Sequence, residues 1–522
     1  MVLAIKIQKL IHFDTNYTQS TVYADFQGIS TRLRSLIITK YCILSDEYAI
    51  VFSYLTGGIK ITIHTMQPTF SPNEALASNP ITSVSFAEAF CYWLRLGFLS
   101  FGGPAGQIAL MHHDLVETKR WISEKRFLHA LNYCMLLPGP EAQQLAIYIG
   151  WLLHRGAGGI VAGALFVLPS FFILSFMAWI YMAYGTLPVV LAVLYGVKPA
   201  VVAIVLFAAY RIGLRTLNNQ LMWVIAVSAF IAIFVFKLPF PLILLAAASL
   251  GYLLSQGAPQ YFKRSTAHAA THKGFGPALI DDDTATPEHA YFSWKKMLKV
   301  AIIGLTLWLS AMLLLWLNYG WRGTYTQMAW FFSKAALVTF GGAYAVLPYV
   351  YQGAVEHFHW LTATQMMDGL ALGETTPGPL IMVVTFVGFV GGWSPQTVGV
   401  DAVGSALLAA AIVTFFTFLP SFIFILMGAP LIESTHDQLK FTGPLAAISA
   451  AVVGVIFNLA LFFVYHVLWP QGWTSPIEGP SVLILLCACL ALFRYKVNVV
   501  LLIASCGLFG LVYQISAKIS VL

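Results

Sequence analysis

The chain has 522 residues, of which 59% are hydrophobic and only 9% are charged. Because soluble domains carry about 25% charged residues, much of this apolar surface must face lipid. The net charge of +7 is spread over loops and forms no basic stripe with interleaved aromatic residues, which argues against a nucleic-acid partner. The six scattered cysteines form no Cys-x-x-Cys pair, and no phosphate-binding loop is present. We therefore expect no disulfide framework, no metal ion, no other cofactor and no ATP hydrolysis.

Residues 1–80 are polar and aromatic and form an atypical N-terminal extension. An apolar run near residues 49–63 contains Lys60 and two glycines, and it is shorter than the ~20 residues that a membrane span needs. The extension also lacks the pattern of a cleavable signal peptide. We expect the functional chain to begin near Met66. Deletion of residues 1–65 should leave the activity of the membrane-embedded part intact, and loss of that activity would contradict this expectation.

The rest of the chain predicts about nine full membrane spans. The expected spans lie near residues 157–184, 187–210, 221–236, 238–255, 297–318, 403–430, 441–467, 480–493 and 497–516. They divide the chain into a first repeat (84–255), a polar linker on the cytoplasmic side (256–296), an extra transmembrane helix (297–318) and a second repeat (327–516).

The two repeats share the same series of glycine- and proline-containing motifs. Phe101-Gly102-Gly103 recurs as Phe340-Gly341-Gly342, and Pro138-Gly139-Pro140 recurs as Pro377-Gly378-Pro379 (340 − 101 = 377 − 138 = 239). Further along, Leu168-Pro169-Ser170-Phe171 recurs as Leu419-Pro420-Ser421-Phe422 (419 − 168 = 251). A duplicated apolar sequence with such interruptions is typical of secondary transporters.

Each repeat opens with two interrupted segments, which gives four broken segments in all. In the first repeat they are residues 86–115 and 127–153. Each arm of the second segment has about 13 residues, or roughly 20 Å of helix, which is too short to cross ~30 Å of hydrocarbon. Such a segment is either a re-entrant hairpin or one kinked span.

Charge placement favours the re-entrant alternative. If both broken segments of each copy are re-entrant, five crossings separate equivalent points, and the second copy is inverted. Most Lys and Arg residues then collect on one side, which the positive-inside rule makes cytoplasmic. If only one segment per copy is re-entrant, the copies are parallel and the bias is weaker. The predicted fold is thus an all-α polytopic membrane protein with two homologous inverted-topology repeats.

The breaks are the predicted substrate site. Interrupted backbone inside a membrane is costly unless it lines a cavity or a site, and the residues after each break begin a helix whose N–H groups attract anions. Glycine lets the backbone approach a ligand closely. The candidate glycines are Gly102, Gly103, Gly139, Gly341, Gly342 and Gly378. The alternative is that the breaks are packing kinks.

Matched polar residues lie near the breaks. Arg95 and Lys334 are equivalent (334 − 95 = 239), as are Ser100 and Thr339. Paired cations would suit a divalent oxyanion, and the hydroxyls could donate hydrogen bonds to its oxygens. The alternative for the cations is snorkelling to the membrane interface. Two amides that could also bind the anion follow the first Pro-Gly-Pro, namely Gln143 and Gln144.

Four ionisable residues are candidates for proton coupling, because an intramembrane ionisable group is a functional candidate by default. Glu141 follows the first Pro-Gly-Pro and Glu374 precedes the second. His129 and Asp368 occupy equivalent positions (368 − 129 = 239). The alternative for Glu141 is a structural role at a helix N-terminus.

At these residues the sequence resembles the chromate ion transporter family in its two-domain form. The resemblance rests on Phe101-Gly102-Gly103-Pro104-Ala105-Gly106-Gln107, on residues 137–144, and on the corresponding second-copy motifs, and it covers about residues 84–516. It implies a multi-pass protein of the bacterial inner membrane that exports chromate, uses the membrane potential or a proton gradient, and confers chromate resistance. It also implies oppositely oriented domains.

Two other functions remain as alternatives. Sulfate is a tetrahedral dianion like chromate, so the same scaffold could take up or exchange sulfate. A membrane enzyme that reduces chromate would need a redox centre, and the sequence has no flavin, haem or iron–sulfur pattern, so we expect a transporter and no enzyme. The expected partners are the oxyanion and the lipid bilayer, and the sequence is also compatible with a homodimer.

Overall fold

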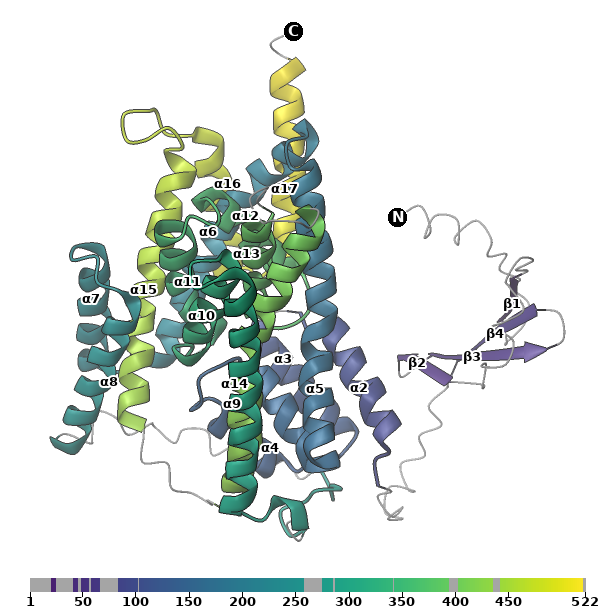
Figure 1. Ribbon diagram of the computed structural model, residues 1–522. Coiled ribbons are helices and arrows are strands. Elements are labelled where there is room, and N and C mark those ends of the chain that lie inside the picture. Colours follow the sequence, from purple (N-terminus) through teal and green to yellow (C-terminus); the bar gives the residue numbers. More distant parts are fainter. Residues whose placement is uncertain are drawn as a thin grey trace. The chain divides into compact units, whose positions relative to one another are not determined.

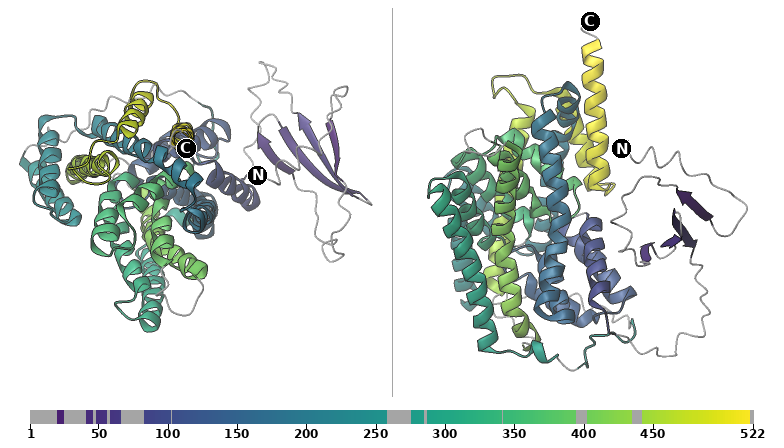
Figure 2. Two further views of the ribbon diagram at one scale, coloured as in Figure 1. Left: turned by 90° about the horizontal axis from the view of Figure 1, so that it is seen from above. Right: turned by 45° about the vertical axis from the view of Figure 1, so that its right-hand side comes forward.

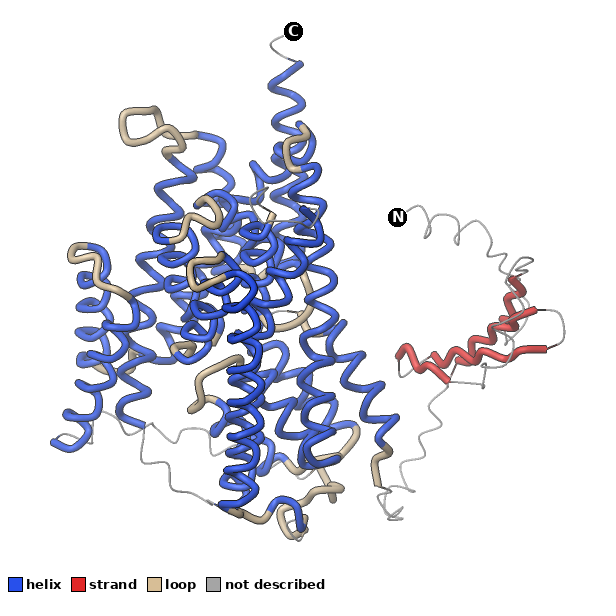
Figure 3. Tube along the Cα trace, viewed as in Figure 1, coloured by secondary structure: helices blue, strands red, loops and turns tan. Residues whose placement is uncertain are grey.

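The computed structural model describes residues 20–24, 41–45, 48–55, 58–65, 83–101, 103–257, 275–284, 287–340, 342–393, 402–434 and 442–519 (Figure 3). The chain divides into two units, Met1–Ile81 and Thr82–Leu522. Gly102 and Gly341, two of the predicted site glycines, lie outside the described residues.

The N-terminal unit contains a four-stranded antiparallel sheet. Its strands are β1 (Ser20–Ala24), β2 (Tyr41–Ser45), β3 (Tyr48–Leu55) and β4 (Gly58–Thr65), in the order β1-β4-β3-β2. β3 and β4 pair from Tyr48↔Thr65 to Leu55↔Gly58. The apolar run that was too short to span a membrane is therefore a hairpin rich in β-branched and aromatic residues, which favour strands.

The first copy begins the second unit, and the regular elements among its described residues are helices. Its elements are α2 (Phe86–Leu99), α3 (Gly103–His112), the π-helical turn η2 (His113–Thr118), α4 (Glu124–Cys134), α5 (Glu141–Tyr184), α6 (Pro188–Thr216), α7 (Gln220–Phe234) and α8 (Phe240–Gly257). Helices end at the Phe-Gly-Gly and Pro-Gly-Pro motifs, as the glycines and prolines predict.

α5 consists of two antiparallel arms. The backbone leaves the helical conformation at His154 (φ −134°, ψ 34°) and Arg155 (φ 55°, ψ −153°). A Cβ atom on Gly150 would lie 2.5 Å from the Gly158 carbonyl oxygen, so glycines allow the arms to pack closely. Residues 141–153 form the short arm, and residues 156–184 form the long arm, which is the span expected near residues 157–184.

The second half of the unit repeats this order. Its elements are η4 (Glu288–Ala290), α9 (Trp294–Tyr319), α10 (Thr324–Leu337), α11 (Ala343–Tyr351), η5 (Gln352–His357), α12 (Ala363–Thr375), η6 (Leu380–Met382), α13 (Val383–Gly392), α14 (Ala402–Ser434), α15 (Thr442–Leu468), α16 (Gly479–Phe493) and α17 (Val499–Ile519). The copies match in detail, because α4 and α12 begin after the equivalent N-caps Ser123 and Thr362. The π-helical turns η2 and η5 are related by the same sequence offset (352 − 113 = 239).

Several of these helices can cross a membrane. Six helices within the described residues are long and apolar enough, namely α5, α6, α9, α14, α15 and α17. The other three expected spans are the shorter apolar helices α7, α8 and α16. In Figures 1 and 2, α7 and α8 lie beside α15, and α17 lies along α6. The protein is thus a multi-pass membrane protein.

Both broken segments of the first copy return to the end from which they start. His154 Nε2 lies 2.9 Å from the Val84 carbonyl oxygen, so the start of α2 meets the turn of α5. Ser123, which precedes α4, donates a hydrogen bond of 2.6 Å to Asp282 of the linker. His289, also in the linker, contacts the carbonyl oxygen of Trp151 at 3.1 Å. We call this the linker end; α2, α3 and α4 lie in the lower part of Figure 1.

The broken segments of the second copy gather at the opposite end. A Cβ atom on Gly391, at the end of α13, would lie 2.5 Å from Met328 of α10 and 3.0 Å from Trp360. α10–α13 lie in the upper part of Figure 1. The long arm of α5 and α14 run antiparallel between the two ends, because Gly159 meets Leu426 whereas Gly163, one turn later, meets Phe422.

Candidate functional site

The two Pro-Gly-Pro turns are bonded to each other's copy. The Gly139 N–H donates to the Thr339 carbonyl oxygen at 2.8 Å, and the Gly378 N–H donates to the Ser100 carbonyl oxygen at 2.8 Å. These contacts are equivalent, because both donors and both acceptors are related by the same sequence offset (378 − 139 = 339 − 100 = 239). We call this pair of contacts the crossed turns. Each copy satisfies the broken backbone of the other.

Close packing and backbone conformation both require glycine in these turns. Gly139 has φ +130° and Gly378 has φ +103°, values that side chains disfavour. A Cβ atom on Gly378 would lie 2.6 Å from the Ser170 Cβ atom, and one on Gly139 would collide with Ser421 Oγ. Ser170 and Ser421 are the serines of the repeated Leu-Pro-Ser-Phe motif, so each turn presses against the equivalent serine of the other copy.

The crossed turns are surrounded by polar atoms without partners. Ser170 and Ser421 are at most 1% exposed, and neither hydroxyl has a hydrogen-bond partner among the described residues. The Gln143 amide, three residues after Pro140, is fully buried and likewise has no partner among the described residues for either its oxygen or its nitrogen. Leaving a buried polar group unpaired costs about 1–3 kcal/mol, so a cluster of them calls for a functional explanation.

Two further buried amides hold the turns in place. Gln107 Nε2 donates to the Gly378 carbonyl oxygen at 2.6 Å, and Gln144 Nε2 donates to the Pro138 carbonyl oxygen at 2.8 Å. The Oε1 atoms of both amides remain without partners among the described residues. The equivalent second-copy positions, residues 346, 382 and 383, hold Val, Met and Val in place of Gln107, Gln143 and Gln144. The amides therefore come from the first copy alone.

Ser100 and Thr339 lie at the crossed turns but point their hydroxyl protons elsewhere. Both side chains are fully buried. Ser100 Oγ donates to the Leu96 carbonyl oxygen, and Thr339 Oγ1 donates to the Ala335 carbonyl oxygen at 2.6 Å. The sequence predicted that these hydroxyls donate to an anion; in this conformation they donate to their own helices, and their carbonyl groups make the contacts between copies.

At Gly103 and Gly342, glycine is required for its backbone conformation and not for close packing. Their φ angles are +71° and +96°, and, apart from the adjoining residues of the chain, no atom of the described residues lies within 4 Å of the position that a Cβ would take. Each follows the break of its Phe-Gly-Gly motif and precedes or begins a helix. Open space therefore adjoins both breaks.

Arg95 and Lys334 are not brought to the buried breaks. Both are exposed on the surfaces of α2 and α10. Five helical residues correspond to a rotation of about 140° at 3.6 residues per turn, so each cation faces away from Ser100 or Thr339. Lys334 Nζ lies 5.6 Å from the centre of the Trp330 ring. This placement favours the interfacial alternative over direct contact with a substrate at the breaks.

The four candidates for proton coupling have different surroundings. Asp368 is 2% exposed and accepts a hydrogen bond of 2.9 Å from Tyr181. His129 contacts the Ile432 carbonyl oxygen at 3.0 Å. Glu374 accepts a hydrogen bond from Tyr344 of α11, and Glu141 lies half-buried in the first turn of α5. Of the four, Asp368 is the most buried carboxyl group.

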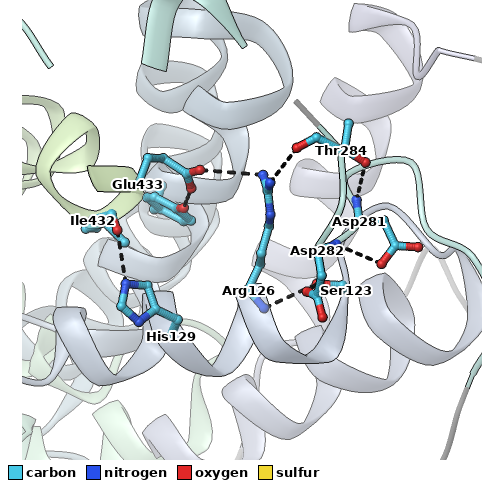
Figure 4. A network of polar contacts seen from close by, with 9 residues as sticks. Ser123, Arg126, His129, Asp281, Asp282, Thr284, Ile432 and Glu433 are labelled. Carbon is cyan, nitrogen blue, oxygen red and sulfur yellow. Dashed lines mark hydrogen bonds and ion pairs between the residues drawn. The ribbon is translucent and has the colours of Figure 1, made fainter. Parts of the chain in front are cut away.

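A network that the sequence did not reveal joins the copies at the linker end (Figure 4). Glu433 of α14 accepts a hydrogen bond from Tyr148 and forms an ion pair of 3.5 Å with Arg126 of α4. Arg126 also donates to the Thr284 carbonyl oxygen at 2.7 Å. The equivalent positions at the opposite end hold Gln365, Met182 and Val387 in place of Arg126, Glu433 and Tyr148. Only the linker end therefore has this ion pair.

Removing the charge of Glu433 should loosen the linker end. In Glu433→Gln, Arg126 loses its carboxylate partner in a largely buried setting, where breaking an ion pair costs up to about 3–5 kcal/mol. We expect a lower melting temperature and faster maleimide labelling of Cys134, which is fully buried at the end of α4, in a variant that keeps only this cysteine. Glu117→Gln, which changes a carboxylate exposed at the same end, should leave labelling unaltered. Equal labelling of both variants would contradict the role of the network.

Several site residues escaped the sequence interpretation, although some carried a signal. Ser170 and Ser421 belong to a repeated motif, and Gln107 belongs to the first Phe-Gly-Gly segment. Tyr148, Tyr181 and Glu433 make contacts between copies that are far apart in the sequence. No local pattern predicts such pairs.

Broken helices that meet within a duplicated, apolar helical bundle are typical of polytopic membrane transporters. Residues 87–252 and 326–511 both match the profile of the chromate transporter family. The chain belongs to the chromate transporter family.

Three individual relatives are similar in sequence to this chain over most of their length. A chromate transport protein of Cupriavidus metallidurans is 29% identical over 446 residues, which cover 84% of this chain and 97% of the relative. A chromate transport protein of Pseudomonas aeruginosa is 31% identical over 428 residues, covering 82% and 92%. A probable chromate transport protein of Synechococcus elongatus is 27% identical over 413 residues, covering 77% and 93%. No solved structure matches the chain.

Proposed function

We propose that this protein is a secondary transporter that exports chromate across the bacterial inner membrane and thereby confers chromate resistance. Three similar proteins are named for chromate transport, and the chain shares both repeats of the family. The membrane potential is an adequate driving force, because moving a dianion through 100 mV is worth about 4.6 kcal/mol, twice the value for one charge. A proton gradient would add to it.

The crossed turns are the proposed substrate site, and their unpartnered polar atoms are the observation that carries this proposal. Ser170, Ser421 and Gln143 can donate hydrogen bonds to a tetrahedral oxyanion from both copies. The short arm of α5 begins beside this cluster, and its N-terminal N–H groups favour an anion. The predicted residues Gly103 and Gly342 supply the open space next to the turns.

The exposed cations Arg95 and Lys334 would act on the anion before it binds at the crossed turns. Arg95 and Lys334 lie five residues ahead of the two breaks on exposed helix faces. At these positions they would attract the anion toward the two entrances, because charged residues near an entrance raise the local concentration of a substrate of opposite charge. Direct ligation would then fall to the hydroxyl and amide groups of the crossed turns.

The two copies are proposed to have inverted topology, with the linker end in the cytoplasm. The loop before α4 and the first turn of α4, both at this end, carry Lys119, Arg120, Lys125 and Arg126. The corresponding second-copy loop, residues 351–364, contains no Lys or Arg. This bias agrees with the positive-inside rule. Alternating access would then rock one copy against the other around the crossed turns.

Flux of radiolabelled chromate into proteoliposomes tests the function. We expect the purified protein to accumulate chromate when the lumen is made positive, and to lose this activity when the potential is collapsed. Protein-free vesicles and vesicles with the inactive variants described below serve as controls. Absence of potential-driven flux would contradict the proposal. Stronger inhibition by sulfate than by unlabelled chromate would instead identify sulfate as the preferred substrate, an alternative that the named relatives do not support.

A further inference from the structure

Asp368 on α12 is a buried carboxyl group with an incomplete set of partners. It is 2% exposed, and its Oδ2 atom accepts a hydrogen bond of 2.9 Å from the Tyr181 hydroxyl. Its Oδ1 atom has no hydrogen-bond partner among the described residues, and no cation of the described residues lies within 4.0 Å of the carboxyl group. An ionised carboxylate is strongly disfavoured in such a place, whereas a protonated one carries no net charge.

The charged surroundings of Asp368 are sparse. α12 packs against α5, α6, α13, α15, α17 and η6. Tyr181 faces it from α5, and Lys198 acts on it electrostatically from α6; α13 and η6 contain no ionisable residue. The remaining ionisable residues of these elements and of α12 itself are Glu374 on α12, Glu141, Tyr148, His154, Arg155 and Tyr184 on α5, Tyr195, Tyr210, Arg211 and Arg215 on α6, Tyr465 and His466 on α15, and Cys506, Tyr513 and Lys518 on α17. Among the described residues, Lys198 is the one cation whose charge acts on this carboxyl group.

Lys198 also borders an open space. It lines a cavity of about 530 Å³ between α6 and α17, together with Tyr195 and Gln514. The other six residues that line this cavity are apolar, so Lys198 is its one cation.

Asp368 also sits where the two copies meet. Its contact with Tyr181 joins the second broken segment of the second copy to the end of the long arm of α5. The equivalent contact at the linker end joins His129 to Ile432 of α14 (368 − 129 = 239; 432 − 181 = 251). We call these two contacts the joints between the copies. Both joints would have to rearrange for one copy to rock against the other. A change in the relative position of the copies would therefore alter the surroundings of the Asp368 carboxyl group.

We propose that Asp368, with Tyr181 and Lys198, forms a proton-binding site that is separate from the crossed turns and couples anion export to the proton gradient. A proton from water binds Oδ1 in the conformation described, in which the joint is closed and the carboxyl group is neutral. Opening of the joint admits water and Lys198, which stabilise the carboxylate, and the proton is released to water. No other bond forms or breaks. The inference rests on the proposed export function and adds its coupling ion.

The accumulation of chromate in proteoliposomes tests this site. The full chain is reconstituted, the potential is clamped, and only the pH difference is varied. In the wild type, a change of one pH unit should alter the steady-state accumulation ratio about tenfold for each coupled proton. Asp368→Asn should still accumulate chromate in response to the potential, but its steady-state accumulation ratio should not change with the pH difference. Glu356→Gln, which changes an exposed carboxyl group on η5, should behave as the wild type.

Two variants of the neighbouring residues test the site without removing the carboxyl group. Lys198→Met removes the charge that favours the carboxylate, and Tyr181→Phe removes its hydrogen bond. Both should move the pH of half-maximal flux upward, by about one unit for Lys198→Met. A purely structural role would lower flux at every pH and leave this midpoint unchanged, which would overturn the proposal. These measurements remain informative if Asp368→Asn fails to fold.

The outcomes separate this inference from the export function. If chromate accumulation in wild-type vesicles depends on the potential but not on the pH difference, the proposed proton site is contradicted and the export function stands. The same holds if Asp368→Asn keeps the wild-type response to pH, or if a sodium gradient replaces the pH gradient. If wild-type vesicles respond to neither potential nor pH, the export function itself is wrong.

Discussion

Gly139→Ala and Gly378→Ala should each reduce chromate flux by about two orders of magnitude. Both glycines have positive φ angles, and strain of this kind costs about 1–3 kcal/mol. The added Cβ would also collide with Ser421 in one case and lie 2.6 Å from the Ser170 Cβ atom in the other. To relieve the collision, each turn must move and stretch its hydrogen bond to the other copy.

Because the two contacts are equivalent, the two substitutions should have similar effects. Flux per folded protein, measured at equal amounts in the vesicles, is the appropriate measure. Gly213→Ala in α6 is a matched control, because no atom lies closer than 3.5 Å to its new Cβ and alanine favours helices. Wild-type flux in either turn variant would show that the crossed turns tolerate displacement and are not the substrate site.

Ser170→Ala and Ser421→Ala should each weaken chromate binding by about 10- to 100-fold, because a hydrogen bond to a charged group contributes about 1.5–3 kcal/mol. Without chromate, the same variants should be as stable as the wild type or more stable. Each removes a buried hydroxyl that has no partner among the described residues, so no hydrogen bond of the protein is lost. Affinity and stability should thus move independently.

Ser333→Ala provides the contrast for this experiment. Ser333 is also buried, but its hydroxyl accepts a hydrogen bond of 2.8 Å from Trp308 and donates one of 2.7 Å to the Ala329 carbonyl oxygen. Its removal should lower the melting temperature and leave chromate affinity unchanged. Chromate-dependent thermal shifts measure both quantities. If Ser170→Ala and Ser421→Ala lose stability and keep affinity, the serines are structural and the binding site lies elsewhere.

The broken helices were predictable because their causes are local. Glycine and proline interrupt helices by conformation and by the missing N–H group, so the Phe-Gly-Gly and Pro-Gly-Pro motifs located the breaks at residues 100–103 and 135–140. Apolar length likewise predicted the positions of the spans. The non-helical turn at His154 and Arg155, which divides α5 into two arms, was not evident from the sequence, because neither residue has a strong preference for such a turn.

The site itself was only partly predictable. The constant spacing between the repeated motifs identified equivalent positions in the two copies, but not that Gly139 bonds to Thr339 and Gly378 to Ser100. Those pairings depend on how the copies pack. The exposed positions of Arg95 and Lys334 were predictable. Each lies five residues before Ser100 or Thr339, and in a helix this spacing places the two side chains on different faces. The N-terminal sheet depends on strand pairing, which spacing alone does not show.

The crossed turns also bear on how the chain is made. Thr339, the acceptor for Gly139, belongs to the second copy and is synthesised long after its donor (339 − 139 = 200). At about 5–20 residues per second, the ribosome needs roughly 10–40 s to produce that stretch. During this delay the Gly139 N–H of the newly inserted first copy lacks its hydrogen-bond acceptor, the Thr339 carbonyl oxygen. Biogenesis of the first half is therefore completed only when the second half arrives.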